Sequence, residues 1–295
     1  MRIVNFGSMN LDHVYAVDHF VRGGETILSG DLTDCAGGKG LNQSVAVARS
    51  GAAICHAGML GVGGEPLRAL LDEAGVDTSL LQPCAAPQGH TVIQVTPDGQ
   101  NSIIVFGGSN REVTPAYMDE TLARFRAGDY LMLQNEVSNL PYALKAAKKW
   151  GLRIVLNASP INDELLGLDL HGLEWLVVNE LECMALAGVQ EVFEAYEALK
   201  VRYPEVGILL TLGGDGSISW KDGEEVRQQV YPAQAVDTTG AGDTFVGYFV
   251  GSLAQGLSRK EAMDLASMAA SIAVSRPGAA PSIPAVSEVR ARLGK

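Results

Sequence analysis

The segment Asp237-Thr238-Thr239-Gly240-Ala241-Gly242-Asp243-Thr244-Phe245 predicts a glycine turn that leads directly into a buried helix. Small residues at 240–242 let the backbone approach a ligand closely, and apolar residues recur with helical spacing between 245 and 253. Free amides and the helix dipole at such an N-terminus suit a phosphate group in transfer. Asp243 would lie in the first turn, where its carboxylate can accept a proton from an attacking hydroxyl. An ordinary N-cap aspartate after a glycine turn is the alternative.

A second glycine-rich segment, Ala36-Gly37-Gly38-Lys39-Gly40-Leu41-Asn42-Gln43-Ser44, opens another predicted helix, Leu41–Ser50. It is not a P-loop, because Gly40 follows Lys39 where Ser or Thr is required, and the glycine expected five residues before the lysine is Asp34. Gly38, Lys39 and Asn42 could instead form hydrogen bonds with a polyol. A glycine-rich turn with a solvated lysine remains the alternative.

Short apolar runs alternate with helical patterns along the chain, which predicts an α/β fold with a mostly parallel sheet flanked by helices. The expected strands are Ile3–Phe6, Tyr130–Leu133, Ile154–Asn157, Trp175–Val178 and Ile208–Leu212. The expected helices are Leu41–Ser50, Glu65–Ala74, Pro115–Arg124, Leu140–Trp150, Phe193–Tyr203, Asp243–Gln255 and Arg259–Ser275. Two β-rich segments, about 12–36 and 88–108, interrupt this alternation and could pair into one small sheet that covers a site or forms a subunit contact.

Polar side chains follow several of these strands. They lie at Asn10-Leu11-Asp12, Gln134-Asn135-Glu136, Asn179–Glu182 and Thr211–Gly216. Each group could be ordinary turn chemistry, but all fall at carboxyl ends of strands, the edge where open α/β sheets bind ligands. The segment Gly58–Gly64 fails the dinucleotide-binding spacing because Pro66 stands where a small residue is needed, so a turn is expected there.

Composition narrows the possible functions. The formal charge of −12 argues against a nucleic-acid or anionic-membrane surface. The four cysteines and five histidines show no metal-ligand spacing. With no signal peptide and no apolar run near the roughly 20 residues of a membrane span, a cytoplasmic protein is expected.

Taken together, these residues resemble the ribokinase/phosphofructokinase-B family of carbohydrate kinases nearly end to end. The resemblance rests on Gly-Gly-Lys-Gly-x-Asn at 37–42 with Asp-Thr-x-Gly-Ala-Gly-Asp-Thr-Phe at 237–245. The start 7–12, the turn at 24–26 and the segment 276–282 are also similar. The resemblance implies a single Rossmann-like domain over 1–295, with a small β lid formed by about 12–36 and 88–108, through which two copies often form a homodimer.

The same resemblance implies roles for individual residues. Sugar hydroxyls would be held by Asn10, Asp12, Gly38, Lys39, Asn42 and Glu136. The nucleotide site would contain Asn179, Thr211, Gly213, Gly216 and Ser267, where Ser267 replaces the Asn or His common near adenine. Gly240, Ala241 and Gly242 would form the anion hole and Asp243 the base. A monovalent-cation loop would use Asp237, Thr239, Ala273, Arg276, Gly278 and Ser282, and Glu182 is linked to Mg²⁺.

We therefore expect ATP-dependent phosphorylation of a small sugar, with ribose to ribose 5-phosphate first and with Mg²⁺ and K⁺ as cofactors. Kinases for another pentose, a ketohexose or a nucleoside stay open. A non-catalytic sugar or nucleotide sensor on the same fold is a further alternative, although the presence of Asp243 argues against it. A nicotinamide-linked oxidoreductase is disfavoured by the failed glycine spacing at 58–66.

Overall fold

The computed structural model describes residues 1–294, within which a nine-stranded sheet forms the body of the protein. The strand order is β13 (Glu224–Gln228), β12 (Ser217–Lys221), β11 (Gly207–Thr211), β10 (Trp175–Asn179), β9 (Arg153–Asn157), β8 (Tyr130–Gln134), β1 (Ile3–Phe6), β4 (Ile54–Val62) and β5 (Asp77–Pro87). All neighbouring strands from β11 to β5 are parallel, and β12 and β13 add antiparallel pairs at one edge. The expected α/β class is confirmed.

Helices cover both faces of this sheet. One face packs against α1 (Lys39–Arg49), α2 (Glu65–Glu73), α8 (Ala241–Ala254), α9 (Arg259–Ala273) and α10 (Val286–Arg292). The other packs against α3 (Pro115–Leu122), α4 (Leu140–Trp150), α5 (Asp163–Leu166), α6 (Glu180–Ala187) and α7 (Val192–Arg202). Successive residues of β8 alternate between the two cores, with Leu131 and Leu133 on one side and Tyr130 and Met132 on the other. The central strands are therefore mostly apolar, as is typical of parallel strands buried on both faces, and the polar residues Asn5 and Gln134 are exceptions.

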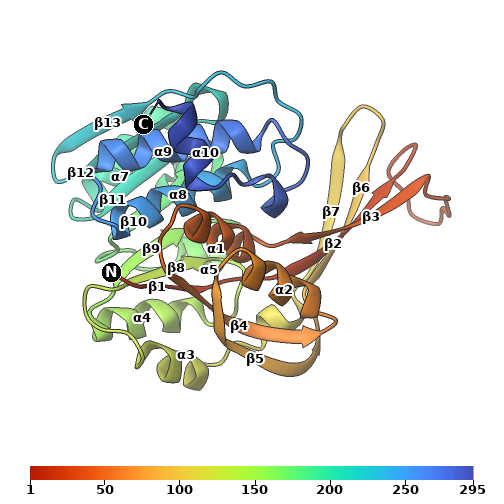
Figure 1. Cartoon of the computed structure of the whole chain (residues 1–295), viewed down its shortest axis with the longest axis horizontal. Helices are drawn as coiled ribbons and strands as arrows, with labels where there is room; N and C mark the ends of the chain where they lie inside the picture. The colour runs from red at the N-terminus through yellow and green to blue at the C-terminus, as the bar shows by residue number, and fades with distance from the viewer. Residues whose placement is uncertain (295) are drawn as a thin grey trace.

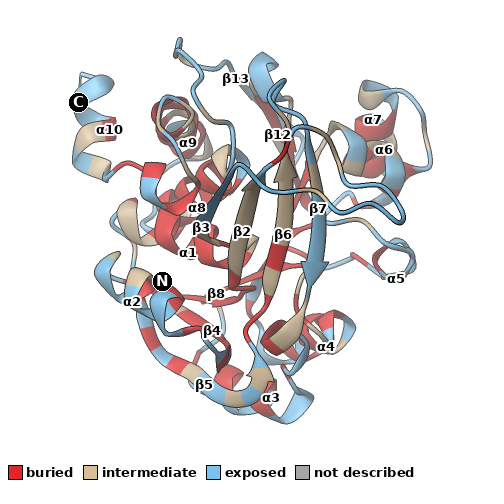
Figure 2. Ribbon diagram, turned by 90° about the vertical axis from the view of Figure 1, so that its right-hand side faces the viewer, coloured by how far each residue is buried: buried red, intermediate tan, exposed pale blue. Residues whose placement is uncertain are grey.

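A separate four-stranded sheet, called the small sheet below, projects from this body (Figure 1). Its order is β3 (Asp31–Gly37), β2 (Asn10–Ala16), β6 (His90–Val95) and β7 (Asn101–Phe106). β2 and β6 pair in parallel although they come from distant segments, with Leu11 opposite His90. The two β-rich segments of the sequence thus form one sheet, as expected. Its edge strands β3 and β7 are largely exposed (Figure 2).

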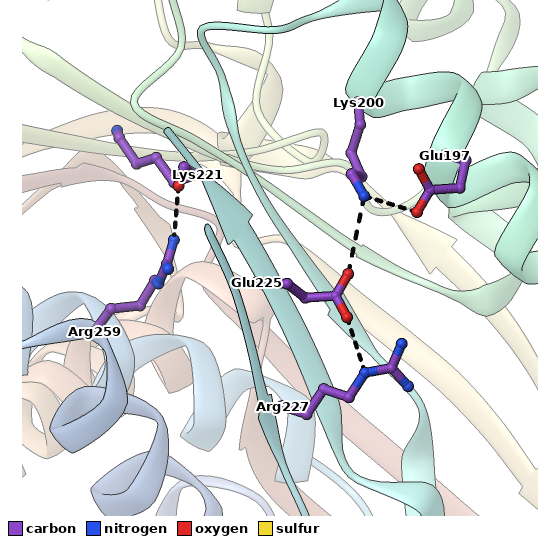
Figure 3. Close-up of polar contacts among 6 residues, drawn as sticks. All are labelled: Glu197, Lys200, Lys221, Glu225, Arg227 and Arg259. Atoms are coloured by element: carbon purple, nitrogen blue, oxygen red, sulfur yellow. Dashed lines mark hydrogen bonds and ion pairs between the residues drawn. The ribbon is translucent and has the colours of Figure 1, made fainter. Parts of the chain in front are cut away.

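The antiparallel edge of the large sheet is charged. Lys200 on α7 forms ion pairs with Glu197 at 2.7 Å and with Glu225 on β13 at 3.9 Å, and Glu225 also pairs with Arg227 (Figure 3). Arg259 on α9 donates to the carbonyl of Lys221 on β12. Exposed ion pairs of this kind contribute little stability. Charged side chains on an edge strand do oppose pairing with another chain.

One expected turn is wrong. Gly58 and Gly61 lie inside β4, which continues to Val62 between β1 and β5. A Cβ on Gly61 would stand 2.7 Å from the carbonyl oxygen of Ala86, so these glycines permit close strand packing. Strands β5, β12 and β13 and helix α6 were not expected from the sequence. No helix within residues 1–294 has the length and apolar character needed to cross a membrane.

Candidate active site

Two glycines of the segment 36–44 bring the start of α1 against the end of β1. A Cβ on Gly40 would stand 2.2 Å from the Cα of Gly7, so only glycine allows this contact. Gly38 caps the helix with φ of 96°, and a Cβ there would lie 2.9 Å from the carbonyl oxygen of Ser8. Both positions require glycine for steric reasons. They place Lys39 at the carboxyl edge of the sheet.

Helix α8 begins in the glycine turn of the segment 237–245. Gly240 has φ of 72°, and a Cβ on it would meet Ala279 at 2.9 Å. A Cβ on Gly242 would meet nothing within 4 Å, because Gly242 faces open space. The amide of Ala241 donates to the carbonyl of Thr238 at 3.2 Å. Within residues 1–294 the amides of Gly242 and Asp243 have no such acceptor. Of the amides expected in the anion hole, that of Ala241 is therefore occupied, and Gly242 and Asp243 carry free donors in the first turn.

Asp243 lies in the first turn of α8, as expected, and is buried. Its two oxygens accept from two neighbouring residues of α1: Oδ2 from Asn42 Nδ2 and Oδ1 from Gln43 Nε2, both at 3.0 Å. Burial raises the pKa of the Asp243 carboxyl, while Lys39, Asn42 and Gln43 oppose that rise. The side chain is not an N-cap, because both oxygens bond to another helix. A buried, oriented carboxylate with raised proton affinity is suited to general-base chemistry.

Three carboxylates surround Lys39. Burial alone would lower the pKa of its ammonium group, but Asp243, Glu136 and Glu182 together raise it. Burial raises the pKa of Glu136, which also accepts hydrogen bonds from the hydroxyl of Ser8 and, at 3.2 Å, from the backbone amide of Lys39. Burial likewise raises the pKa of Glu182. Lys39 is thus held charged at the junction of α1, α6 and α8.

A cavity of about 160 Å³ lies at this junction. Its lining includes Lys39, Asn179, Glu182, Thr211, Gly240, Gly242 and Asp243, all expected from the sequence. Asn157 and Ser159 also line it and were not predicted, although Asn157 ends a predicted strand. Asn179 and Glu182 additionally form a capping box at the start of α6, each accepting the other's backbone amide at 2.9 Å. That arrangement fixes where Glu182 meets the cavity.

A larger cavity of about 540 Å³ adjoins the first and shares Thr211 and Gly242 with it. Of the predicted nucleotide residues, Thr211, Gly213, Gly216 and Ser267 line it, together with Ala241. Apolar side chains such as Phe245 and Val274 complete its wall. The Ser267 hydroxyl donates to the carbonyl of Gln229 at 2.8 Å. A largely apolar pocket with few polar groups suits a flat heterocyclic ring.

The expected sugar residues Asn10 and Asp12 lie apart from these cavities, at the base of the small sheet. Asn10 Oδ1 accepts from Asn110 Nδ2 at 2.8 Å. Asp12 accepts from the Thr91 hydroxyl at 2.6 Å, and burial raises the pKa of its carboxyl. A Cβ on Gly37 would clash with Asp12 Oδ2 at 1.8 Å, so that glycine makes room for the carboxylate. Neither side chain lines either cavity.

The two segments of the expected cation loop lie side by side. Asp237 joins them, since Oδ1 accepts from the amide of Thr239 at 2.9 Å and Oδ2 from the amide of Gly278 at 2.8 Å. These hydrogen bonds lower the pKa of Asp237 although burial opposes the shift. Arg276 forms an ion pair with Glu288 and donates its amide to Ala273, and the Ser282 hydroxyl donates to Ala279. Within residues 1–294 no three His, Cys, Asp or Glu side chains form a metal cluster.

Sequence reasoning missed the role of Gln43. It stood inside the quoted glycine motif, one residue after Asn42, yet no function was assigned to it. The signal that could have found it is helical spacing: Lys39, Asn42 and Gln43 are at positions i, i+3 and i+4 and therefore share one face of α1.

Comparison with known proteins gives consistent results. The family model described as pfkB family carbohydrate kinase matches residues 1–286. Ribokinase from Haemophilus influenzae is 34% identical over 291 residues, covering 94% of each chain. Ribokinase from Cryptococcus neoformans in complex with ADP superposes with a TM-score of 0.87 at 34% identity, over 99% of each chain. Ribokinase from Arabidopsis thaliana complexed with ribose and ATP gives 0.85 at 31% identity, over 99% of this chain and 98% of that one.

Proposed function

The chain belongs to the pfkB family of carbohydrate kinases and is a sugar kinase, and on that premise we propose that it transfers the γ-phosphoryl group of ATP to the 5-hydroxyl of D-ribose. The relatives named as ribokinases, one of them solved with ribose and ATP, support ribose as the acceptor. The observation that carries the proposal is Asp243, buried at the open end of α8 and held by Asn42 and Gln43 beside Lys39.

In the proposed reaction Asp243 accepts the proton of the ribose 5-hydroxyl while the oxygen of that hydroxyl attacks the γ-phosphorus of ATP. The bond from the γ-phosphorus to the bridging oxygen breaks, and ADP leaves with that oxygen. Negative charge on the transferring group is stabilised by the free amides of Gly242 and Asp243 and by the ammonium group of Lys39. The protein thus contributes alignment, one proton acceptor and positive potential, which is most of what phosphoryl transfer needs.

We assign the larger cavity to the adenine end of ATP, with Thr211, Gly213, Gly216 and Ser267 in its wall, and the smaller one to the phosphates near Asn179. Sugar hydroxyls are assigned to Asn10, Asp12, Gly38, Lys39, Asn42 and Glu136. The small sheet is proposed as a lid whose base supplies Asn10 and Asp12. We propose that the small sheet closes toward the body when the sugar binds, so that both residues meet a sugar beside Asp243.

Mg²⁺ and K⁺ are proposed cofactors. Glu182 offers one carboxylate to the smaller cavity, which fits Mg²⁺ because that ion is commonly bound by one or two carboxylates and by substrate phosphates. A Mg²⁺ ion held there would neutralise part of the negative charge on the ATP phosphates. The adjoining loops offer oxygen donors that fit K⁺: Asp237, the carbonyls of Thr239, Ala273, Arg276 and Gly278, and the Ser282 hydroxyl. Asp237 itself ties the turn before α8 to the second loop.

We also propose a homodimer formed through the small sheet. Its edge strand β7 exposes Ile103, Ile104, Val105 and Phe106 by 51%, 63%, 64% and 48%. An apolar edge of this kind favours pairing with a second copy. Analytical ultracentrifugation of wild type and Ile104→Lys tests this, because only a dimer built on β7 should dissociate in the variant. A cytoplasmic location is supported by four free cysteines.

The function is tested by offering ribose, other pentoses, ketohexoses and nucleosides with ATP and Mg²⁺ while ADP release is measured. Ribose should give the highest kcat/KM, and mass spectrometry of the product should find one phosphate at the 5-position. A higher kcat/KM for a nucleoside or ketohexose would reassign the acceptor. ADP release without a phosphorylated product from any of them would contradict a sugar kinase.

A further inference from the structure

Three buried amide side chains form a chain of hydrogen bonds behind Asp243. They are Gln43 on α1, Gln134 at the end of β8 and Asn5 on β1, exposed by 0%, 1% and 0%. Gln43 Nε2 donates to Asp243 Oδ1 at 3.0 Å, and Gln43 Oε1 accepts from Gln134 Nε2 at 2.7 Å. Gln134 Nε2 also donates to Asn5 Oδ1 at 3.1 Å. Because a carboxylate only accepts, the nitrogen of Gln43 must face Asp243, and each amide then orients the next.

This amide chain returns to the helix from which it starts. Asn5 Nδ2 donates to the carbonyl of Gly40 and to the hydroxyl of Ser44, both at 2.9 Å and both on α1. Gln43 is therefore held by its own helix and by two adjacent strands of the large sheet. Each of the three amide nitrogens donates to at least one acceptor, while Gln134 Oε1 is buried without a hydrogen-bond partner among residues 1–294. Because the hydrogen bonds are linked, moving one of these amides disturbs the others.

Asp243 depends on α1 for its orientation. Among residues 1–294 its carboxylate accepts hydrogen bonds from the side chains of Asn42 and Gln43, and Gly240 gives α8 no side-chain cap. Asn42 keeps a free oxygen that can reach a ligand, whereas Gln43 uses its oxygen on Gln134 and a nitrogen on Asp243. We propose that Gln43 is a positioning residue for the catalytic base, fixing through Gln134 and Asn5 the direction in which the Asp243 carboxylate meets the acceptor hydroxyl. This inference rests on the proposed function.

The choice of an amide for this position has an electrostatic reason. Lys39, Glu136 and Glu182 all lie close enough to Asp243 to interact electrostatically with it, so the site contains one cation and three carboxylates. A neutral donor stabilises the charged form of Asp243 without adding charge to that set. Without the Gln43 donor, the Asp243 carboxylate should be held less firmly in its orientation, and its pKa should be higher.

The kinetic test compares Gln43→Met, which keeps the side-chain length, with Gln43→Glu, which keeps the acceptor for Gln134 but places a second carboxylate on Asp243. Gln43→Met should lower kcat by about 10- to 100-fold while the KM values for sugar and ATP change by less than about threefold. Gln43→Glu should move the acid limb of kcat to higher pH. Gln134→Met, which never touches Asp243, should lower kcat in the same manner by about tenfold or less.

Tyr117→Phe is the matched control, since it removes buried hydrogen bonds to Gly58 and Leu80 on the other face of the sheet. It should lower thermal stability and leave kcat and its pH profile unchanged. If Gln43→Met lowers stability but keeps the wild-type kcat and acid limb, Gln43 is only structural. If it raises the KM values and leaves kcat unchanged, the residue serves binding and the proposal is equally wrong.

A readout without turnover separates this inference from the proposed function. In protein labelled with ¹³C at the aspartate carboxyls, the Asp243 signal is identified by its loss in Asp243→Asn and is then titrated. Its pKa should be higher in Gln43→Met than in wild type or Tyr117→Phe. An unchanged titration overturns the positioning role even in an active kinase. A shifted titration supports it even if no sugar is phosphorylated, in which case only the proposed function fails.

Discussion

Asn42 and Asp243 are 201 residues apart in the chain, yet Asn42 Nδ2 donates to Asp243 Oδ2 at 3.0 Å. The other end of the same amide, Oδ1, is buried and has no hydrogen-bond partner among residues 1–294. Leaving a buried acceptor unpaired costs about 1–3 kcal/mol, which a donating ligand can recover. The Asn42 side chain therefore touches the proposed base, Asp243, and offers a free acceptor beside it.

Replacing Asp243 by Asn should remove most turnover. The variant keeps the size of the side chain but cannot accept a proton, and losing a general base typically costs about 10²–10⁴-fold in kcat. Steady-state kinetics with ATP and ribose measure the loss. Asp129→Asn, at a buried carboxylate bound by the amide of Arg2, should keep the wild-type kcat.

The pH profile gives a second readout of that base. In the proposed mechanism Asp243 acts deprotonated, and burial raises its pKa above the ordinary 3.8, so kcat should fall as the pH drops through this raised value. A kcat that stays constant down to the ordinary aspartate range, or an Asp243→Asn variant as active as wild type, would contradict the assignment.

Gly242→Ala should fold normally but phosphorylate poorly. The added methyl group meets no atom within 4 Å, so we expect no loss of thermal stability. It would nevertheless occupy the space where the phosphate approaches the free amides, and removing access to one such donor costs about 10²–10³-fold in kcat. Thermal melting and kcat are measured together. A variant that melts early would show that Gly242 does not face open space. A variant with full activity would show that Gly242 does not face the transferring group.

Asp12→Ala should weaken sugar binding more than ATP binding. In a closed site, a hydrogen bond donated by a sugar hydroxyl to the Asp12 carboxylate contributes about 1–3 kcal/mol to sugar binding. Its loss should therefore raise the sugar KM about 5- to 150-fold. Glu136→Ala should act in the same direction but more mildly. Ribose, 2-deoxyribose and fructose are compared. A rise in the ATP KM with unchanged sugar KM values would place Asp12 outside the sugar site.

K⁺ should activate the enzyme more than Na⁺ does at equal ionic strength. Asp237 ties the turn before α8 to the loop at Gly278, so a cation held there would order the free amides without touching substrate. Rates are compared in K⁺, Na⁺ and tetramethylammonium buffers, and Asp237→Asn should reduce the difference. Equal rates in all three buffers would remove the cation site from the proposal.

His56 should make the fold less stable at mild acidity. Burial lowers its pKa from 6.5 to about 4, and its neutral ring lies between the Ser44 hydroxyl and the carbonyl of Gly7. The unfolded chain binds the proton first, so stability is lost as the pH falls from about 6.5 to 4, on the order of 3 kcal/mol in all. Urea unfolding against pH measures this slope. In His56→Gln the slope across this range should be smaller, and an unchanged slope would assign it to other groups.

The parts predictable from sequence were those with a local cause. The glycines at 38, 40 and 240 are required by positive φ or by close backbone contact, and such positions leave a readable pattern. Asn179 and Thr211 could be placed because carboxyl ends of parallel strands meet at one edge. The position of Asp243 in the first turn of α8 followed from helical spacing alone.

Other features depend on packing that the sequence does not display. Gly58 and Gly61 look like turn residues but lie in a strand, because β5 runs alongside this part of β4 and their amides donate to the Tyr117 hydroxyl and to Gln88 Oε1. Gln43 and Gln134 look like ordinary polar residues, yet both are buried, and their partners lie far away in the chain. The amide of Ala241 is occupied by Thr238, which only the detailed turn geometry reveals.

The separation of Asn42 from Asp243 also has a consequence in time. Ribosomes add about 5–20 residues per second, so 201 residues correspond to roughly 10–40 seconds between the emergence of α1 and of α8. Throughout that interval Asn42 and Gln43 on α1 lack the Asp243 carboxylate that accepts their hydrogen bonds. The apolar residues of α1 that will pack against α8 are likewise not yet covered by it. The nascent chain therefore lacks the proposed base until residue 243 has been made, and we expect truncated products that end before α8 not to consume ATP through this site.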